Sequence, residues 1–268
     1  ASSSSQPHRI VWVDVLRFLA IFMVICIHCA DPFNVSPEAR SNPEFNFWGS
    51  IYGSFLRPCV PLFVMITGLL LLPVNMPIQS FYKKRLLRIA VPFLVWSVLY
   101  NLFPWITGVL GLSSAVIADV FAYASPDASQ SFGDAMTNIA LIPFKFNVYT
   151  VPMWYLYMLI GLYLYMPFFS AWIEKANLSQ KKIFLGIWGI TLFLPGTFYY
   201  FAGFNGYLLL GYYLAKDVKE WNWVKTVGVA VPLFAIGYIV TYIGFKSITA
   251  NPDCTEQEME MFFLYCSP

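Results

Sequence analysis

A hydrophobic segment of 21 residues, Ile10–Ala30 (IVWVDVLRFLAIFMVICIHCA), contains three ionisable side chains, Asp14, Arg17 and His28. As a helix with a rise of ~1.5 Å per residue, the segment crosses the ~30 Å hydrocarbon core of a bilayer. An Arg or Asp near the middle of such a helix costs on the order of 2.5–3.5 kcal/mol on insertion scales. Residues this costly usually mark a polar interior site, so the segment predicts a membrane helix with a functional role.

The three ionisable side chains lie on one face of this predicted helix. At ~100° per residue, Arg17 and His28 point within about 20° of the same direction, and Asp14 within about 60° of both. Along the axis, however, Arg17 and His28 are ~16 Å apart. His28 is the natural general base or acyl acceptor because imidazole titrates near neutral pH. Two alternatives stay open: His28 bonds a carbonyl at the interface, and Asp14 simply pairs with Arg17 to lower their burial cost.

The composition predicts a polytopic membrane protein. Hydrophobic residues make up 59% of the chain and charged residues 11%, whereas soluble domains contain roughly 25% charged residues. This excludes a soluble protein. The net charge of +2, without basic clusters among aromatic residues, excludes nucleic acid as a partner and leaves membrane lipids.

The cysteines do not indicate a metal site. Cys26, His28 and Cys29 are metal-ligand types, but neighbours one to three apart on one helix give poor tetrahedral geometry and no second ligand pair follows. We therefore expect no metal. Cys254 and Cys266 could form a disulfide if the C-terminal segment is extracytoplasmic.

Seven long apolar stretches predict an all-α bundle of about seven transmembrane helices. They are residues 10–30, 47–72, 86–110, 151–173, 182–201, 203–216 and 223–245. The corresponding organisation is a polar cytoplasmic segment 1–9, a membrane domain 10–245 with a loop 111–150, and an extracytoplasmic segment 246–268. We expect loop 111–150 to contain a short amphipathic helix on the outer surface.

Loop charges predict the orientation. Net positive charge is found before the first stretch and in the connections 73–88, 174–182 and 216–225, whereas the loops 31–46 and 111–150 are net negative. Because positive loops stay cytoplasmic, the N-terminus is predicted to be cytoplasmic and the acidic loops extracytoplasmic.

Two further groups of residues are candidates for a site. Arg57 lies inside the second stretch, where Pro58 and Pro61 should open backbone carbonyls, which is tolerable only beside a cavity or protein. The basic run at the cytoplasmic start of the third stretch contains Lys84, Arg85 and Arg88. Arg85 and Arg88 form a fork suited to phosphates, although a stop-transfer cluster or a site for anionic lipids fits equally.

An aromatic pair, Trp154-Tyr155, opens the fourth stretch. The pair is either part of the interfacial aromatic belt or a platform for a sugar ring.

In this order and spacing, the residues resemble the acyltransferase-3 family of integral membrane acyltransferases. Arg17 and His28, separated by ten residues, match the motif of the family's first helix. Arg85–Arg88 matches its second arginine pair, and Arg57–Gly68 and Met153–Tyr163 resemble its second helix and fourth-region signature.

The resemblance extends from about residue 8 to residue 245 and is greatest to stand-alone bacterial O-acetyltransferases of surface glycans. Thr67 stands where serine is commoner in the family. The family typically has about ten membrane helices, so we expect C-terminal helices to be missing here, with an eighth beginning in Met259–Pro268.

The resemblance implies transfer of an acetyl group from cytoplasmic acetyl-CoA to a hydroxyl of an extracytoplasmic polysaccharide or lipid-linked glycan at the bacterial cytoplasmic membrane. It implies that His28, Arg17 and Asp14 are catalytic. The residues expected to hold acyl-CoA are Arg85, Arg88, Lys84 and Arg57, and those expected to hold the acceptor are Trp154 and Tyr155. The rival is a transporter or flippase in which the polar face is the translocation path and Asp14 and His28 relay protons.

Overall fold

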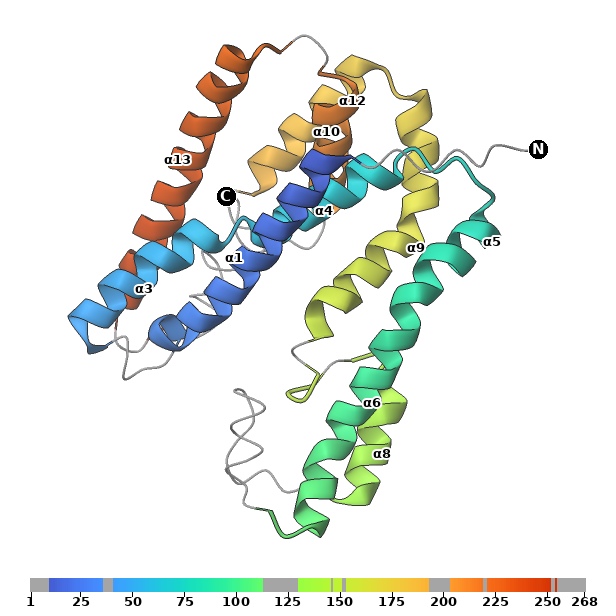
Figure 1. Cartoon of the computed structure of the whole chain (residues 1–268), viewed down its shortest axis with the longest axis vertical. Helices are drawn as coiled ribbons and strands as arrows, with labels where there is room; N and C mark the ends of the chain where they lie inside the picture. Colours follow the sequence, from blue (N-terminus) through green and yellow to red (C-terminus); the bar gives the residue numbers. More distant parts are fainter. Residues whose placement is uncertain are drawn as a thin grey trace. The chain divides into compact units, whose positions relative to one another are not determined.

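The computed structural model describes residues 10–35, 41–112, 130–145, 147–150, 153–192, 203–218, 221–251 and 254, and every regular element among them is a helix (Figure 1). The elements are α1 (Val11–Val35), α3 (Pro43–Leu56), α4 (Cys59–Leu71), α5 (Ile78–Phe81), the π-helix η1 (Tyr82–Leu86), α6 (Leu87–Val109), α8 (Phe132–Leu141), α9 (Trp154–Lys175), α10 (Leu178–Thr191), α12 (Asn205–Lys216) and α13 (Trp223–Thr249). The chain forms two compact units. Unit 1 comprises Ala1–Leu72 with Lys175–Pro268, and unit 2 comprises Pro73–Glu174.

Five helical segments are long and apolar enough to cross a membrane. They are Val11–Ala30, Pro43–Leu71, Ile78–Val109, Trp154–Lys175 and Trp223–Thr249. Each coincides with one of the predicted apolar stretches. The prediction of an all-α, polytopic membrane bundle is therefore confirmed, and the chain is an integral membrane protein.

The two other predicted stretches contain shorter described helices. α10 has 14 residues and α12 has 12, which gives lengths of about 21 and 18 Å. Residues 193–202 lie outside the described part of the chain, so membrane crossing by these stretches stays a prediction.

A buried ion pair joins α10 to the end of α12. The Lys181 ammonium donates to Asp217 Oδ2 at 3.0 Å, and only 8% of the Lys181 side chain is exposed. The pair links the connections 174–182 and 216–225, which the loop charges place on one side of the membrane. It therefore holds these two connections together, and the side of the membrane on which they lie stays a prediction.

Glycines allow α4 and α12 to approach very closely. A Cβ atom on Gly68 would overlap the carbonyl oxygen of Leu208, and a Cβ atom on Gly211 would overlap that of Met65. Small residues let membrane helices pack backbone to backbone. Van der Waals attraction then stabilises the helix pair, because the hydrophobic effect does not drive helices together in lipid. These two positions therefore fix α12 against α4.

α1 packs on α3 and α4 through residues spaced seven apart. Val13, Ala20 and Ile27 are 2%, 0% and 4% exposed. A seven-residue repeat keeps one seam facing the partner along a helix pair. This seam fixes which side of α1 faces its neighbours, and hence where its ionisable residues point.

Unit 2 is held together by polar contacts between segments far apart in the sequence. The Tyr82 hydroxyl donates to the Leu164 carbonyl at 2.8 Å, and the Val74 N–H donates to Ser170 Oγ at 2.7 Å. The predicted short helix in loop 111–150 is confirmed as α8, which begins with a capping box between Ser131 and Asp134. Its place on the outer surface stays a prediction.

We predict that Gly68→Ala and Gly211→Ala each destabilise the protein by about 1–3 kcal/mol, because the added methyl forces α4 and α12 apart. Gly228→Ala in α13 is the matched control, since nothing lies within 4 Å of a Cβ there. Alanine also favours a helix by about 1 kcal/mol over glycine, so the control should be neutral or stabilising. Thermal unfolding in detergent measures the difference, and equal effects at all three positions would contradict the close contact.

Candidate active site

The first three candidate residues lie on α1 as predicted. Arg17 Nη1 is 3.5 Å from Asp14 Oδ1, and their side chains are 46% and 34% exposed. The predicted pairing of Asp14 with Arg17 is confirmed, and the catalytic roles of both residues stay predictions. His28 lies nearer the C-terminal end of α1, with an exposed side chain.

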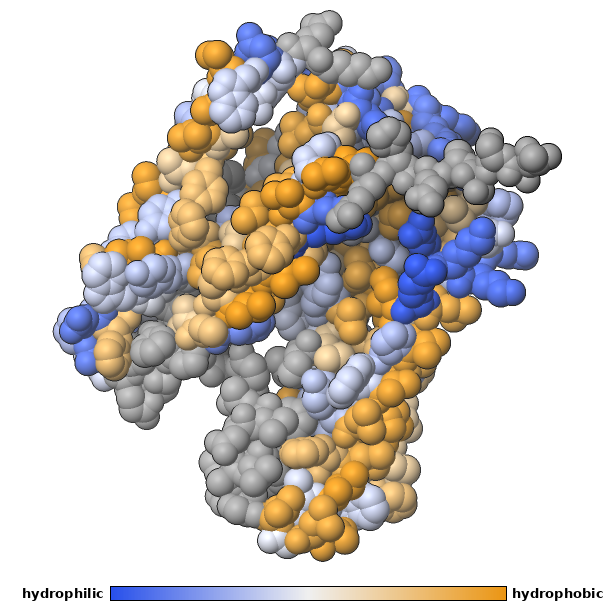
Figure 2. Space-filling model, viewed as in Figure 1, coloured by the Kyte–Doolittle hydropathy of each residue, from blue (hydrophilic) through white to orange (hydrophobic). Residues whose placement is uncertain are grey.

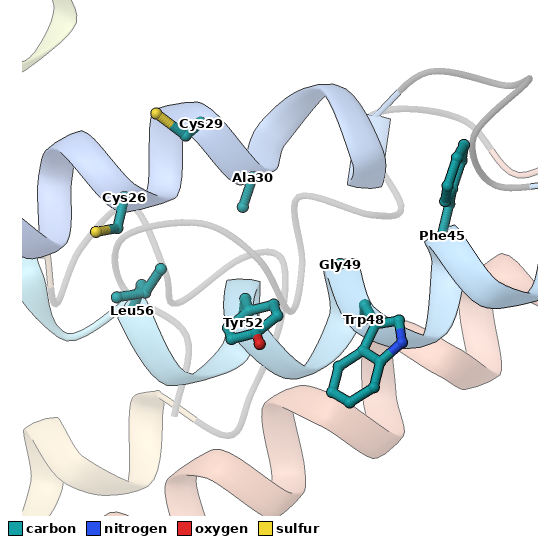
Figure 3. A pocket seen from close by; sticks show the side chains of 8 residues that line it. All are labelled: Cys26, Cys29, Ala30, Phe45, Trp48, Gly49, Tyr52 and Leu56. Atoms are coloured by element: carbon teal, nitrogen blue, oxygen red, sulfur yellow. The ribbon is translucent and has the colours of Figure 1, made fainter.

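A hollow of about 330 Å³ lies between α1 and α3 (Figure 3). Its lining residues are Cys26, Cys29, Ala30, Phe45, Trp48, Gly49, Tyr52 and Leu56. His28 is not among them, although it lies between Cys26 and Cys29 in the sequence. The hollow therefore marks one flank of the α1–α3 pair, and His28 points elsewhere.

Helical periodicity places the polar face of α1 on the opposite flank. Ile27 is buried in the seam, and its neighbours Cys26 and His28 each point about 100° away from it in opposite directions. Cys26 lines the hollow, so His28 lies on the other side. Arg17 shares the direction of His28 and lies on that side too.

The same reasoning applies to α3. Gly49 and Gly53 are buried in its small-residue face, and Trp48 and Tyr52, which precede them, line the hollow. The residues that follow each glycine, Ser50 and Ser54, therefore lie on the flank away from the hollow. They are buried, with 0% and 3% of their surface exposed. Polar residues of α1 and α3 consequently share one flank of the helix pair, which we call the polar flank.

Arg57 and Asn46 extend this row along α3. Asn46 is one turn before Ser50 and is 7% exposed, and Arg57 follows one turn after Gly53. α1 and α3 run antiparallel, so Asn46 and His28 lie near the same end. Arg57 is eleven residues beyond Asn46, and Arg17 is eleven residues before His28. Both arginines therefore lie ~16 Å deeper along the pair than that end.

The helix opens at Arg57, as the prolines predict. α3 ends at Leu56 and α4 begins at Cys59, with Pro58 as its N-cap. The Nε atom of Arg57 is buried. The break gives Arg57 a place beside protein rather than lipid, where irregular backbone is tolerated.

The basic residues proposed for acyl-CoA lie in unit 2, in and after a π-helical turn. The Leu87 N–H donates to the Tyr82 carbonyl, five residues back, so Lys84 and Arg85 lie in a widened turn. Such turns are rare in proteins, and those that occur are often found at functional sites. Lys84, Arg85 and Arg88 are all exposed, and Figure 2 shows hydrophilic surface over α5 and the start of α6. The third span begins at Ile78, eight residues before its predicted start at residue 86, so the run is helical.

Trp154 and Tyr155 begin α9 and contact each other edge to face. Their ring centroids are 5.9 Å apart, with an interplanar angle of 85°. Both residues are half-buried. Their role as an acceptor platform stays a prediction.

Sequence reasoning missed a buried amide cluster in unit 2. Asn101 is 0% exposed; its side chain donates to the Ser97 carbonyl and accepts from Asn147, both at 2.8 Å. Gln130 donates to the Asn101 carbonyl at 3.2 Å. The signal available was an asparagine inside an apolar span, which usually has a polar partner. The cluster fixes the segment after α8 to α6.

Tyr149 packs beside this cluster, against Tyr100 and Phe103. Burial raises the pKa of the Tyr149 hydroxyl, and the negative charge of Asp134 raises it further. The hydroxyl therefore stays protonated at neutral pH and remains a hydrogen-bond donor.

A family model described as an acyltransferase domain, that of the acyltransferase-3 family, matches residues 10–267. The chain belongs to the acyltransferase-3 family. The match spans both units and includes every candidate residue described above. No curated protein and no solved structure matches the chain. The protein is therefore a membrane acyltransferase, as the sequence motifs indicate.

We predict that His28→Cys and Asn46→Cys, in a background without the native cysteines, are bridged by a bis-maleimide about as long as the ~8–10 Å between packed helix axes. Ile25→Cys with Asn46→Cys is the control, because Ile25 points about 160° from Ile27 and is 57% exposed. Mass spectrometry of the bridged peptides measures the yield. Equal bridging of both pairs would show that His28 and Asn46 do not share a flank.

Proposed function

We propose that the protein transfers an acetyl group from cytoplasmic acetyl-CoA to a hydroxyl of an extracytoplasmic polysaccharide or lipid-linked glycan. One observation carries this proposal: α1 and α3 present Arg17, Arg57 and His28 on one flank, with ~16 Å between the arginines and the histidine along the pair. A donor with charged phosphates and a long arm fits such a separation. Family membership supports acyl transfer over the transporter reading.

His28 activates the acceptor in this proposal. Its neutral imidazole takes the proton of the acceptor hydroxyl while the oxygen attacks the thioester carbonyl of acetyl-CoA. The carbon–sulfur bond then breaks, the CoA thiolate leaves, and the proton held by His28 neutralises it. Alternatively, the imidazole first accepts the acetyl group itself and passes it to the hydroxyl. Both routes need His28 at the acceptor end.

Arg17 and Arg57 orient the arm of the donor, because ~16 Å along the helix pair separates them from His28 and the thioester it acts on. Asp14 keeps Arg17 in place through their ion pair.

Within unit 2, Arg85 and Arg88 bind the CoA phosphates with help from Lys84, and the Trp154–Tyr155 pair binds the acceptor sugar. In this proposal the protein lies in the bacterial cytoplasmic membrane with its N-terminus in the cytoplasm, and the loop charges support that orientation.

We predict that His28→Ala abolishes acetyl transfer while CoA binding stays within about twofold, because the imidazole acts on the acceptor and not on the nucleotide. Purified protein is incubated with radiolabelled acetyl-CoA and lipid-linked glycans, and covalent label on the glycan is counted. Full transfer by His28→Ala would contradict the role of His28. Movement of glycan across the membrane without any label would instead favour a flippase.

We also predict that Arg85→Ala with Arg88→Ala weakens CoA binding by at least about tenfold, because two charge-assisted contacts to phosphate are lost. Lys182→Ala removes an exposed cation from α10 and serves as the control. Equilibrium binding of labelled CoA to protein in nanodiscs measures both. Unchanged CoA affinity in the double variant would indicate that Arg85 and Arg88 bind anionic lipids instead of CoA.

A further inference from the structure

Lys246, near the C-terminal end of α13, is a cation whose hydrogen-bond partner is a neutral side chain. Its ammonium donates to Asn46 Oδ1 of α3, and the residue is half-buried. No carboxylate of the described residues pairs with it, whereas Lys181 in the same unit pairs with Asp217. A partly buried charge that has no counter-ion among the described side chains is costly, and in a membrane span such a charge usually has a functional role.

Asn46 places this cation on the polar flank. Asn46 is on the side of α3 away from the hollow and at the same end as His28, as the helix directions above require. The end of α13 therefore adds a third helix to the polar flank, at the end of the α1–α3 pair where His28 lies. Sequence reasoning did not single out Lys246, since a lysine near the end of a span usually reaches the interface.

The contact leaves Lys246 able to bind a ligand. An ammonium has three N–H donors, and the contact with Asn46 uses one of them. Asn46 is itself held, because the Ser50 hydroxyl donates to its backbone carbonyl. The lysine is thus oriented by a buried amide and keeps two donors for an anion.

We propose that Lys246, oriented by Asn46, binds the phosphate of a lipid-linked acceptor. The identity of the acceptor rests on the proposed acyl transfer to glycans. A lysine in the last turn of a span lies where lipid phosphates are found, and lysine binds phosphate as a point charge. With the phosphate on Lys246, the sugar attached to it lies beside His28, so the same contact selects lipid-linked acceptors.

The test is equilibrium binding of radiolabelled farnesyl monophosphate to protein in nanodiscs of phosphatidylcholine. We expect farnesol, which lacks the phosphate, to compete at least about tenfold more weakly than unlabelled farnesyl monophosphate. Lys246→Gln should weaken binding about tenfold, whereas Lys246→Arg should stay within about threefold. Lys225→Gln at the opposite end of α13 is the control, because Lys225 is exposed and lies over the Trp221 ring.

Several outcomes would overturn the proposal. One is wild-type affinity in Lys246→Gln, and another is an equal loss in Lys225→Gln. If Lys246→Gln does not fold, Asn46→Ser tests the proposal instead. Loss of the amide that orients Lys246 should weaken binding of farnesyl monophosphate several-fold. Unchanged binding in Asn46→Ser would contradict the proposal. Phosphatidic acid competing as well as farnesyl monophosphate would assign the site to ordinary lipid headgroups.

The acetyl-transfer assay keeps this proposal separate from the proposed function. Phosphate binding that depends on Lys246 in a protein without transfer activity would contradict only acyl transfer to glycans. Transfer to a lipid-linked glycan with an unchanged KM for that acceptor in Lys246→Gln would contradict only the role of Lys246.

Discussion

The cost of holding ionisable side chains in hydrocarbon governs the architecture of unit 1. Arg17 and Arg57 each lie in a segment able to span a bilayer, where lipid offers neither water nor hydrogen bonds. Two devices lower that cost: Asp14 pairs with Arg17, and the helix break places Arg57 beside protein. The seam on α1 and the buried glycines of α3 fix how the two helices face each other, so that their other polar residues lie on the polar flank. The site thus follows from helix packing, which collects the ionisable residues on one flank of the α1–α3 pair.

Close packing elsewhere in unit 1 supports this arrangement. α4 continues from α3 after the break at Arg57, so its contact with α12 through Gly68 and Gly211 also fixes the position of Arg57. α13 crosses the other end of α3, where Lys246 contacts Asn46. Both ends of the polar flank are therefore held by helices distant in sequence.

Much of this was predictable from local sequence. Apolar stretches predicted all five candidate spans of the described residues, the spacing of Asp14 and Arg17 predicted their pair, and Pro58 predicted the helix break. The shared flank was not predictable, because helical periodicity fixes directions on each helix but not the seam through which two helices meet. Lys246 and Asn101 were missed for a related reason. Each has its partner far along the chain, and one sequence does not specify that pairing.

The central claim is that a donor on the cytoplasmic side acetylates an acceptor hydroxyl on the opposite side. Sealed proteoliposomes with protein of one orientation, radiolabelled acetyl-CoA on the N-terminal side only, and a membrane-impermeant esterase on the other side measure it directly. We expect labelled glycan from which the esterase removes the acetyl group while the vesicles stay intact, and no labelled glycan with His28→Ala. Labelled glycan that the esterase reaches only after detergent is added would contradict it.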